Sequence, residues 1–216
     1  PEQMDVDPYD ECGNCHGDGF AGVCVGSDDC DDMACDGDCD QVAYTDDCGE
    51  CDDTPNTDCV DLSIGLHSGP NLISFSALPL DHSVASIFSN TGCEVDGIMG
   101  QGGGAIYMNG NWYGTVLDVQ ADKGYWAMTN GDCTLFLEDC EPVSYDEDGP
   151  VVYNLGFGPN LISYPYSVCQ DIEDAFGECI DLVHGIFGEG VAAVNINGVF
   201  SGSLASDGLC AENGYW

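Results

Sequence analysis

Apolar and polar residues alternate in short runs along the last two-thirds of the chain, a pattern typical of half-buried β-strands. Leu62–Leu66 has an apolar side chain at every second position, and Asn71–Phe75 predicts the next strand. Ala105–Met108 and Trp112–Val116, separated by an Asn-Gly turn, predict a β-hairpin. Tyr125–Met128 predicts a further strand.

Helical spacing is confined to two short segments. Val84, Ile87 and Phe88 follow the acidic residue Asp81 at helical intervals, and predict a short helix within residues 81–89. Its counterpart is the segment 171–176. The pattern therefore predicts a mainly β fold.

The same series of motifs occurs twice, in the same order and at an offset of 88 to 90 residues. We therefore interpret it as two tandem small β modules of the β-sandwich type, each with a short helix. The matched pairs are Gly69–Ser74 with Gly158–Ser163, Gly97–Gly102 with Gly185–Gly190, Asn109-Gly110 with Asn197-Gly198, and Gly124–Trp126 with Gly214–Trp216.

Four regions are predicted. Residues 1–60 form an acidic cysteine-rich segment, 61–141 β module 1, 142–150 a linker, and 151–216 β module 2. The first segment holds nine of the 15 cysteines and 19 of the 40 acidic residues, but few large aliphatic ones. Because such a composition cannot build a packed core, we expect it to be irregular and held by disulfides and calcium.

The charge balance excludes some classes of function. Forty acidic residues against one basic residue, Lys123, give a formal net charge of −39, which argues against nucleic-acid binding. No apolar run is long enough to predict membrane insertion. The cysteine content indicates an extracellular or cell-surface location, so we expect that a leader has been removed before Pro1 or that the sequence is a fragment.

Most cysteines of the first segment are expected in disulfides, because they are dense and lack a core. They are Cys12, Cys15, Cys24, Cys30, Cys35, Cys39, Cys48, Cys51 and Cys59. Cys169 and Cys179 flank the second predicted helix and are predicted to pair locally. Since the total is odd, one cysteine should be free or bonded to another chain.

Carboxylates in the first segment are candidate Ca²⁺ ligands, because calcium takes six to eight oxygen ligands. The alternative is a solvated, self-repelling acidic face. The candidates are Asp5, Asp7, Asp10, Asp18, Asp28, Asp29, Asp31, Asp36, Asp38 and Asp40.

Catalysis is not predicted, because the four histidines are scattered and no Gly-x-Ser-x-Gly or His-Glu-x-x-His motif occurs. Glycans are a second expected class of partner, which Trp112, Tyr113, Tyr125 and Trp126 could bind if they shared one exposed face. The alternative for these aromatic residues is burial in the core.

Two resemblances add to this picture. Asp10–Gly19, with the partial echo Cys48–Asp53, resembles short cysteine-rich repeats of bacterial surface proteins and of animal extracellular metalloproteases, which implies a spacer. Its Cys-x-x-Cys-x-Gly-x-Gly spacing also looks like the zinc motif of DnaJ-type chaperones. The Asn-Leu-Ile-Ser, Gly-x-Gly and Gly-Tyr-Trp motifs resemble repeated β domains of large secreted bacterial proteins, which implies a role in surface structures or filaments.

The end of the sequence suggests how such subunits could assemble. In the first module, Gly124-Tyr-Trp126 continues into the apolar run Thr134–Leu137, whereas the second ends at Tyr215 and Trp216. A module without its last strand exposes an unpaired edge and an open apolar groove. Either the native chain continues, or a strand of a neighbouring subunit fills the gap, giving head-to-tail assembly with Tyr215 and Trp216 at the contact. We therefore predict a non-enzymatic subunit of an extracellular filament or cell-surface stalk, or alternatively a carbohydrate- or surface-binding module.

Overall fold

The computed structural model describes residues 44–45, 51–52, 59–89, 92–143 and 152–216, and the chain divides into two compact units, Pro1–Thr57 and Asp58–Trp216. The strands in the described ranges are β1 (Tyr44–Thr45), β2 (Cys51–Asp52), β3 (Val60–Leu66), β4 (Gly69–Ile73), β5 (Ala77–Leu78), β6 (Val95–Gly100), β7 (Gly103–Met108), β8 (Asn111–Gly114), β9 (Tyr125–Thr129), β10 (Cys133–Pro142), β11 (Gly185–Gly188), β12 (Val191–Ile196) and β13 (Val199–Ser201). The helices are α1 (Val84–Ile87), α2 (Ile172–Phe176), the 3-10 helix η3 (Gly177–Leu182) and α3 (Leu204–Asp207).

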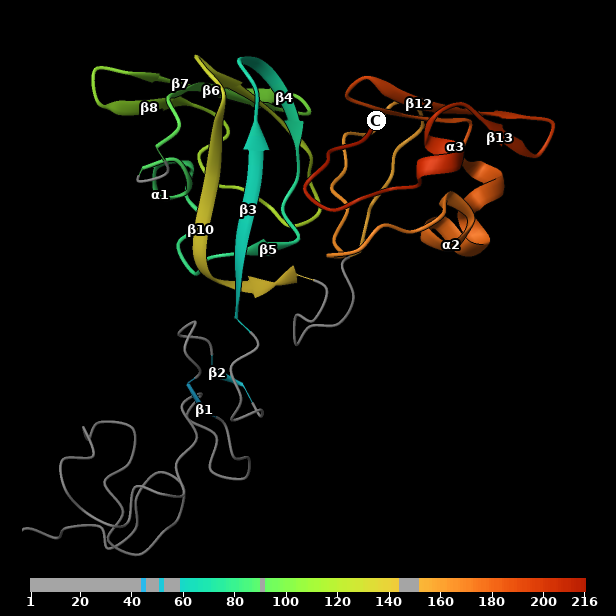
Figure 1. The fold of residues 1–216 in the computed structure, drawn as a ribbon, viewed down its shortest axis with the longest axis horizontal. Helices are drawn as coiled ribbons and strands as arrows, with labels where there is room; N and C mark the ends of the chain where they lie inside the picture. Colours follow the sequence, from blue (N-terminus) through green and yellow to red (C-terminus); the bar gives the residue numbers. More distant parts are fainter. Residues whose placement is uncertain (1–43, 46–50, 53–58, 90–91, 144–151) are drawn as a thin grey trace, which may run out of the picture. The chain divides into compact units, whose positions relative to one another are not determined.

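The fold is mainly β, as predicted, and its strand pairs are antiparallel (Figure 1). The second unit contains a five-stranded sheet in the order β4-β9-β6-β7-β8, and two three-stranded sheets in the orders β3-β10-β5 and β11-β12-β13. The first unit contains the pair β1-β2. None of the helices in the described ranges is long and apolar enough to cross a membrane.

We call residues 60–142 the first copy and residues 152–216 the second copy, after the sequence repeat. The first copy encloses one core between its two sheets. β3 pairs with β10 along its whole length and buries Leu62, Ile64 and Leu66 on one face. Leu135 of β10 is fully buried in the same cluster, together with Phe75.

The second copy has a smaller core and repeats only part of this arrangement. By motif, β11, β12 and β13 match β6, β7 and β8. Trp216 exchanges two backbone hydrogen bonds with Phe187 of β11, and Tyr215 exchanges two with Ile162. The C-terminal residues therefore take the place that β9 has between β4 and β6. The buried residues are Tyr164, Ile172, Ile186, Ala193, Leu204, Leu209 and Tyr215.

The predicted Asn-Gly hairpin is confirmed, and the second copy contains the same turn. Asn109 and Gly110 have φ of 51° and 82°, and Asn197 and Gly198 have φ of 56° and 87°. Two successive left-handed residues match the twist of a two-residue hairpin, and Asn and Gly adopt this conformation most readily.

Both predicted helices are confirmed, although α1 is shorter than the segment 81–89. Ser83 precedes α1 and its hydroxyl accepts a hydrogen bond from the backbone N–H of Ser86 at 3.2 Å. Asp171 precedes α2. η3 and α3 were not predicted. Both are short, η3 buries no residue and α3 buries only Leu204, so neither carries the repeated apolar spacing from which helices are predicted.

The predicted pair Cys169–Cys179 is wrong. Cys169 is bonded to Cys210 and Cys93 to Cys133, whereas Cys179 is free and exposed in η3. Antiparallel pairing of the neighbouring residues Gln170 and Leu209 brings the Cα atoms of Cys169 and Cys210 to 4.0 Å.

The remaining cysteines of the described ranges differ in their state. Cys59 is disulfide-bonded. Cys140 is free and buried, and burial raises the pKa of its thiol to about 11, so it stays protonated and unreactive at neutral pH.

Candidate functional site

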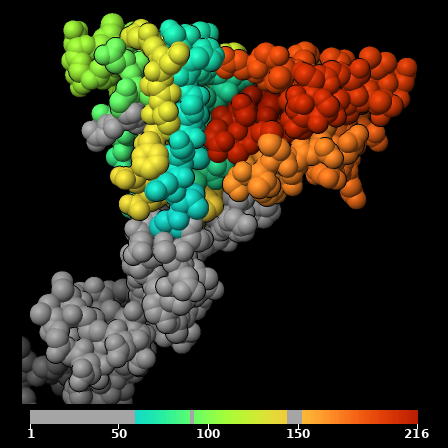
Figure 2. Space-filling model, in the orientation of Figure 1, coloured from blue at the N-terminus to red at the C-terminus, as the bar shows by residue number. Residues whose placement is uncertain are grey.

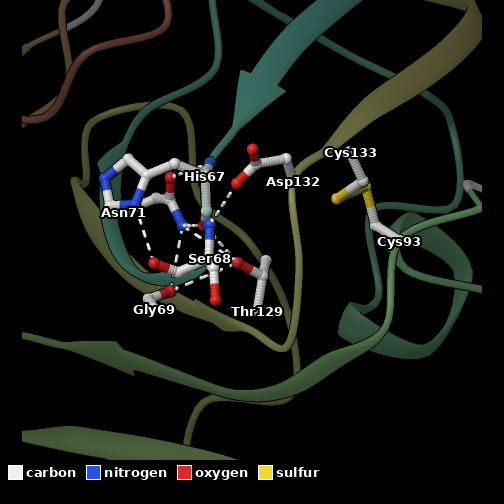
Figure 3. The surroundings of a disulfide bond; sticks show 8 residues. All are labelled: His67, Ser68, Gly69, Asn71, Cys93, Thr129, Asp132 and Cys133. Carbon is white, nitrogen blue, oxygen red and sulfur yellow. Dashed lines mark hydrogen bonds between the residues drawn. A yellow bond between two sulfur atoms is a disulfide. The ribbon is translucent and has the colours of Figure 1, made fainter.

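The Gly-Pro-Asn motif forms the same turn in both copies (Figure 3 shows the first). Asn71 Oδ1 accepts a hydrogen bond from the backbone N–H of His67 at 2.8 Å, and its Nδ2 donates to the carbonyls of His67 and Gly69. Asn160 makes the corresponding three bonds in its own turn. Gly69 and Gly158 have φ of 106° and 104°, which a side chain would strain. The motif is therefore a structural turn that holds the next residues in place.

Neighbouring strands fix this turn in the first copy. Thr129 Oγ1 donates to the carbonyl of His67, and Asp132 Oδ1 accepts from the N–H of Ser68 at 2.9 Å (Figure 3). The disulfide Cys93–Cys133 begins at the residue after Asp132, so it ties the same corner to the start of β6.

The two copies bind each other through reciprocal side-chain contacts. The backbone N–H of Leu72 in the first copy donates to Glu189 Oε2 of the second at 2.7 Å. The N–H of Leu161 in the second copy donates to Gln101 Oε1 of the first at 2.8 Å. Gln101 and Glu189 occupy the same position of the repeated Gly-x-Gly motif. Each copy therefore supplies one acceptor to its neighbour's Asn-Leu-Ile-Ser strand.

The backbone pairs in the same reciprocal way. Ile73 forms an antiparallel bridge with Asn213, and Ile162 forms one with Lys123. Figure 2 shows the C-terminal residues, in dark red, against the cyan residues of the first copy. Contacts that each half makes equally on the other are the mark of an isologous interface.

Serine and glycine residues of the repeated motifs complete this interface. Ser74 Oγ donates to the carbonyl of Asn213 at 2.8 Å, and Ser163 Oγ donates to that of Ala121. A Cβ added at Gly124 would lie 2.6 Å from the carbonyl oxygen of Ile162, and one at Gly214 would lie 2.8 Å from that of Ile73. These motifs therefore recur because they form the contact between the copies.

One position breaks the reciprocity. Gln101 Nε2 donates to the carbonyl of Pro159 at 3.2 Å, but Glu189 has no N–H to donate. Its second oxygen instead faces Nε2 of His67, while Nδ1 of His67 lies 3.0 Å from the carbonyl of Ser68. Both neighbours are acceptors, so both ring nitrogens donate when the ring is protonated. The pKa of His67 is accordingly raised, first by Ser68 and then by Glu189.

A groove of about 320 Å³ opens in the second copy. It lies beside residues 152–155, which match Ser63–Leu66 of β3 in the repeat. Among the described residues, no backbone hydrogen bond joins this segment to another strand. The groove is lined mainly by apolar and aromatic side chains, namely those of Tyr153, Leu155, Ile162, Ser163, Tyr164, Pro165, Tyr166, Ala175, Phe176, Cys179, Leu209 and Tyr215.

The lining of the groove corresponds to the core of the first copy. By the repeat, Tyr164 matches Phe75, and Phe176 matches Phe88. Phe75 and Phe88 are 1% and 8% exposed, in the same cluster as Leu135 of β10. The groove is therefore the position that β10 fills in the first copy.

Tyr164, which lines the groove, has a buried hydroxyl without a partner in the described residues. Tyr164 is only 3% exposed, and its hydroxyl makes no hydrogen bond within the described residues. A buried hydroxyl without a partner is unfavourable by about 1–3 kcal/mol. Burial also raises the pKa of Tyr164 to about 12, so this group remains a hydrogen-bond donor at neutral pH.

No family model, curated protein or solved structure matches this chain. The two resemblances seen in the sequence therefore stay predictions.

Many of the residues predicted from the sequence lie outside the described ranges. All ten candidate calcium ligands, Asp5 to Asp40, lie outside the described residues, as do the cysteines from Cys12 to Cys48. In the described ranges no group of three or more His, Cys, Asp or Glu side chains could hold a metal. Tyr215 lines the groove, and Trp216 pairs with β11.

The aromatic residues considered for glycan binding do not share one exposed face. Tyr125 is 3% exposed in the core, and Trp112 packs against the same core, whereas Tyr113 is 53% exposed. Alternation along β8 sends adjacent side chains to opposite faces. An open apolar groove was predicted for the second module, but its aromatic lining was not.

Proposed function

We propose that this chain is a non-enzymatic structural subunit of an extracellular filament or cell-surface stalk, assembled head-to-tail from two-module subunits. The observation that carries the proposal is the groove of the second copy, beside a segment whose backbone has no strand partner in the described ranges. An open edge next to apolar surface is a site for strand addition from another chain.

The interface between the copies supports this proposal indirectly. A reciprocal contact closes on itself, so Leu72, Glu189 and their equivalents are occupied within the chain. Growth of an open filament needs a second surface, one that contacts the next subunit head-to-tail. The groove is our candidate for that surface. Disulfides in both copies suit a protein that must keep its shape outside the cell.

Assembly is tested by sedimentation velocity and negative-stain electron microscopy of the purified chain over a concentration series with Ca²⁺ present. We expect open polymers that lengthen as concentration rises. Monomers, or discrete closed dimers, at every concentration would contradict a filament role. The segment Pro1–Tyr9, the nearest strand donor considered from sequence, lies outside the described residues.

Calcium is proposed to screen the acidic segment 1–60 and to order it. The chain carries a formal net charge of −39, so its carboxylates repel one another, and bound Ca²⁺ would reduce this repulsion. Addition of EDTA should increase the rate of proteolysis within residues 1–60, and isothermal titration should detect Ca²⁺ binding. Identical digestion patterns with and without EDTA would sink the calcium proposal.

A second candidate function is carbohydrate or surface binding. It is favoured by the aromatic residues Tyr153, Tyr166 and Phe176 in the groove, since aromatic side chains can stack on sugar rings. A glycan array probed with the monomeric chain tests this function. Binding that is lost in the variant Leu155→Glu, which alters the groove rim, would favour it over assembly.

A further inference from the structure

We propose that the outer face of this protein binds the same face of a second copy of the chain. The outer face is the side of the five-stranded sheet and of the sheet β11-β12-β13 that points away from the two cores. This contact is separate from the proposed head-to-tail contact and does not rest on the filament role. Its exposed apolar residues are Met99, Ile106, Met108 and Tyr113 in the first copy and Phe187, Val194, Ile196 and Val199 in the second.

Strand register places these side chains on one face of each sheet. Ile106 lies opposite Tyr113, while Ala105, the residue before Ile106, is 3% exposed in the core. In the second copy, Val194 follows Ala193, which is fully buried. Adjacent residues of a strand point to opposite faces, so the buried neighbours fix the exposed residues on the outer side.

Both copies direct this face to the same side of the second unit. Figure 1 shows β7, β8, β12 and β13 along one side, with β5 and α2 toward the other. Three positions of the repeat are apolar and between 40% and 58% exposed in both copies, namely the pairs Met99 and Phe187, Ile106 and Val194, and Met108 and Ile196. One side of the unit therefore presents apolar residues from both copies.

Glycines keep the outer face flat. A Cβ added at Gly104 would lie 3.3 Å from Cγ of Met99, and one at Gly185 would lie 3.2 Å from Cε2 of Phe187. The side chains of Met99 and Phe187 therefore lie across these glycines instead of standing away from the sheet. A flat apolar face can pack against another sheet at a spacing of about 10 Å, as the two sheets of a β-sandwich do.

Charge favours a second copy of this chain as the partner. Residues 97–117 and 190–206 contain no charged side chain, although the chain has a formal net charge of −39. Two chains of this charge repel each other, so they can approach closely only where carboxylates are absent. A basic partner would instead be attracted to acidic side chains, which these strands lack.

The size and composition of the outer face suit a stable contact. A typical stable interface takes about 800 Å² from each partner, and eight apolar side chains that are roughly half exposed offer an area on this order. Interface centres are enriched in aromatic residues and methionine and depleted of acidic residues. Three of the chain's five methionines, Met99, Met108 and Met128, lie on this face. Identical faces on both partners give an isologous contact that closes at the dimer.

The outer face is independent of the groove. β10 pairs with β3 and β5 in the other sheet of the first copy, and the outer face of that copy is exposed with β10 in place. A strand added to the groove of the second copy would therefore leave the outer face open as well.

Sedimentation velocity of the full chain, over a concentration series at two NaCl concentrations, measures the contact. We expect a reversible dimer whose Kd falls at least about threefold between about 0.05 M and about 0.5 M NaCl, because salt screens the repulsion between the chains. A chain that stays monomeric at both salt concentrations up to about 100 µM would overturn the proposal, since an interface of this size holds at lower concentrations. A Kd that rises with salt would also overturn it, because ion pairs would then carry the contact.

Charged variants locate the contact. Ile106→Glu/Val194→Glu places one carboxylate on the outer face of each copy, and we expect the Kd to rise by at least about 10-fold because these charges would be buried. Phe136→Glu/Leu182→Glu is the matched control, since it adds the same charge at residues that are 46% and 78% exposed outside the outer face. The control should dimerise at least about threefold more tightly than the outer-face variant. Equal Kd values for the two variants would overturn the proposal.

A photo-crosslinking residue tests the contact without added charge, so it remains informative if a charged variant fails to fold. Tyr113→p-benzoylphenylalanine replaces a residue that is 53% exposed on the outer face. Irradiation should give covalent dimers whose cross-links map to residues 97–128 or 185–201 of the second copy of the chain. Phe136→p-benzoylphenylalanine is the control and should give none of these dimers. Equal yields from the two positions, or cross-links from position 113 that map elsewhere, would overturn the proposal.

The outcomes for the outer face and for the filament are separable. Dimers that never grow into polymers would support the outer face and contradict the filament role. Polymers that persist in Ile106→Glu/Val194→Glu while the cross-linked dimers are lost would support both contacts. Polymers without any dimer contact through the outer face would support the filament role and overturn this inference.

Discussion

The first copy closes its core with β3 and β10. In the second copy, the described residues 152–155 match Ser63–Leu66 of β3, and no described strand pairs with them. The turns and the hairpins are the same in both copies, so the motifs that form the contact between the copies are preserved in both.

The two copies share motifs, but their cores differ in size. Motif residues such as Asn71 and Asn160 fix local backbone geometry, which needs no large core. Closing the core depends on long-range packing, and here β10 supplies Leu135, Leu137 and Cys140. Because its core is smaller, we expect the second copy to depend more heavily on its disulfide and on its contact with the first.

Removing the disulfides should give the largest effect and the clearest contrast. Cys93–Cys133 and Cys169–Cys210 span sequence separations of 40 and 41 residues, so chain entropy predicts a similar contribution of about 4 kcal/mol from each. We expect the double variant Cys93→Ala/Cys133→Ala to keep the first copy folded, because its core is large. The variant Cys169→Ala/Cys210→Ala should unfold the second copy.

Hydrogen exchange measured peptide by peptide distinguishes these results. Loss of protection confined to residues 152–216 in the second double variant is the expected outcome. If both double variants lose protection equally in both copies, the two copies unfold together. The expectation that only the second copy needs its disulfide to stay folded would then be wrong.

Leu135→Ala tests whether β10 holds the first core. Leu135 is fully buried, so truncation should lower the free energy of unfolding by about 3 kcal/mol. Phe136→Ala, the next residue on the same strand, is the control and should change it by less than about 1 kcal/mol, since Phe136 is 46% exposed. Chemical denaturation measures both. Similar effects at the two positions would mean that β10 does not pack as described.

Several features of this fold could be predicted from the sequence because they depend on local chemistry. The Asn-Gly hairpin and the alternating strand Leu62–Leu66 follow from backbone preference and period-two burial. The short helices after Asp81 and Asp171 follow from spacing. Each is determined within about ten residues of chain.

Other features could not be predicted, because they depend on contacts between distant segments. The bond between Cys169 and Cys210 follows from the pairing of Gln170 with Leu209, which no local pattern indicates. The repeated motifs were recognised, but their role in binding one copy to the other was not. Spacing alone does not tell whether Gln101 faces solvent or the backbone of Leu161.

The reciprocal side-chain contacts give the next test. Gln101→Ala and Glu189→Ala each leave one buried backbone N–H, of Leu161 or Leu72, without its acceptor. Each should lower the free energy of unfolding by about 1–3 kcal/mol. Because the two contacts form one interface, the double variant should deviate from additivity. Thermal unfolding of all three variants measures this, and strict additivity would argue against a single coupled interface.

Glu189→Gln should have the smallest effect, and its pH dependence tests the position at which Glu189 replaces the glutamine of the first copy. Glutamine keeps an acceptor for Leu72, and its amide can donate as that of Gln101 does. What it removes is the charge beside His67. The raised pKa of His67, caused by Ser68, then by Glu189 and to a lesser degree by Asp132, means that the protonated ring stabilises the fold. That contribution is fully present below the unfolded pKa of 6.5, and it is lost as pH rises through the higher folded pKa. The melting temperature of Glu189→Gln should therefore fall below that of the unmodified chain at mildly acidic pH, and the two should converge at alkaline pH. His67→Gln, which removes the contributions of both Ser68 and Glu189, should show a larger difference with the same sign. A gap between the unmodified chain and Glu189→Gln that stays constant across neutral pH would mean that the charge of His67 does not contribute to the contact between the copies.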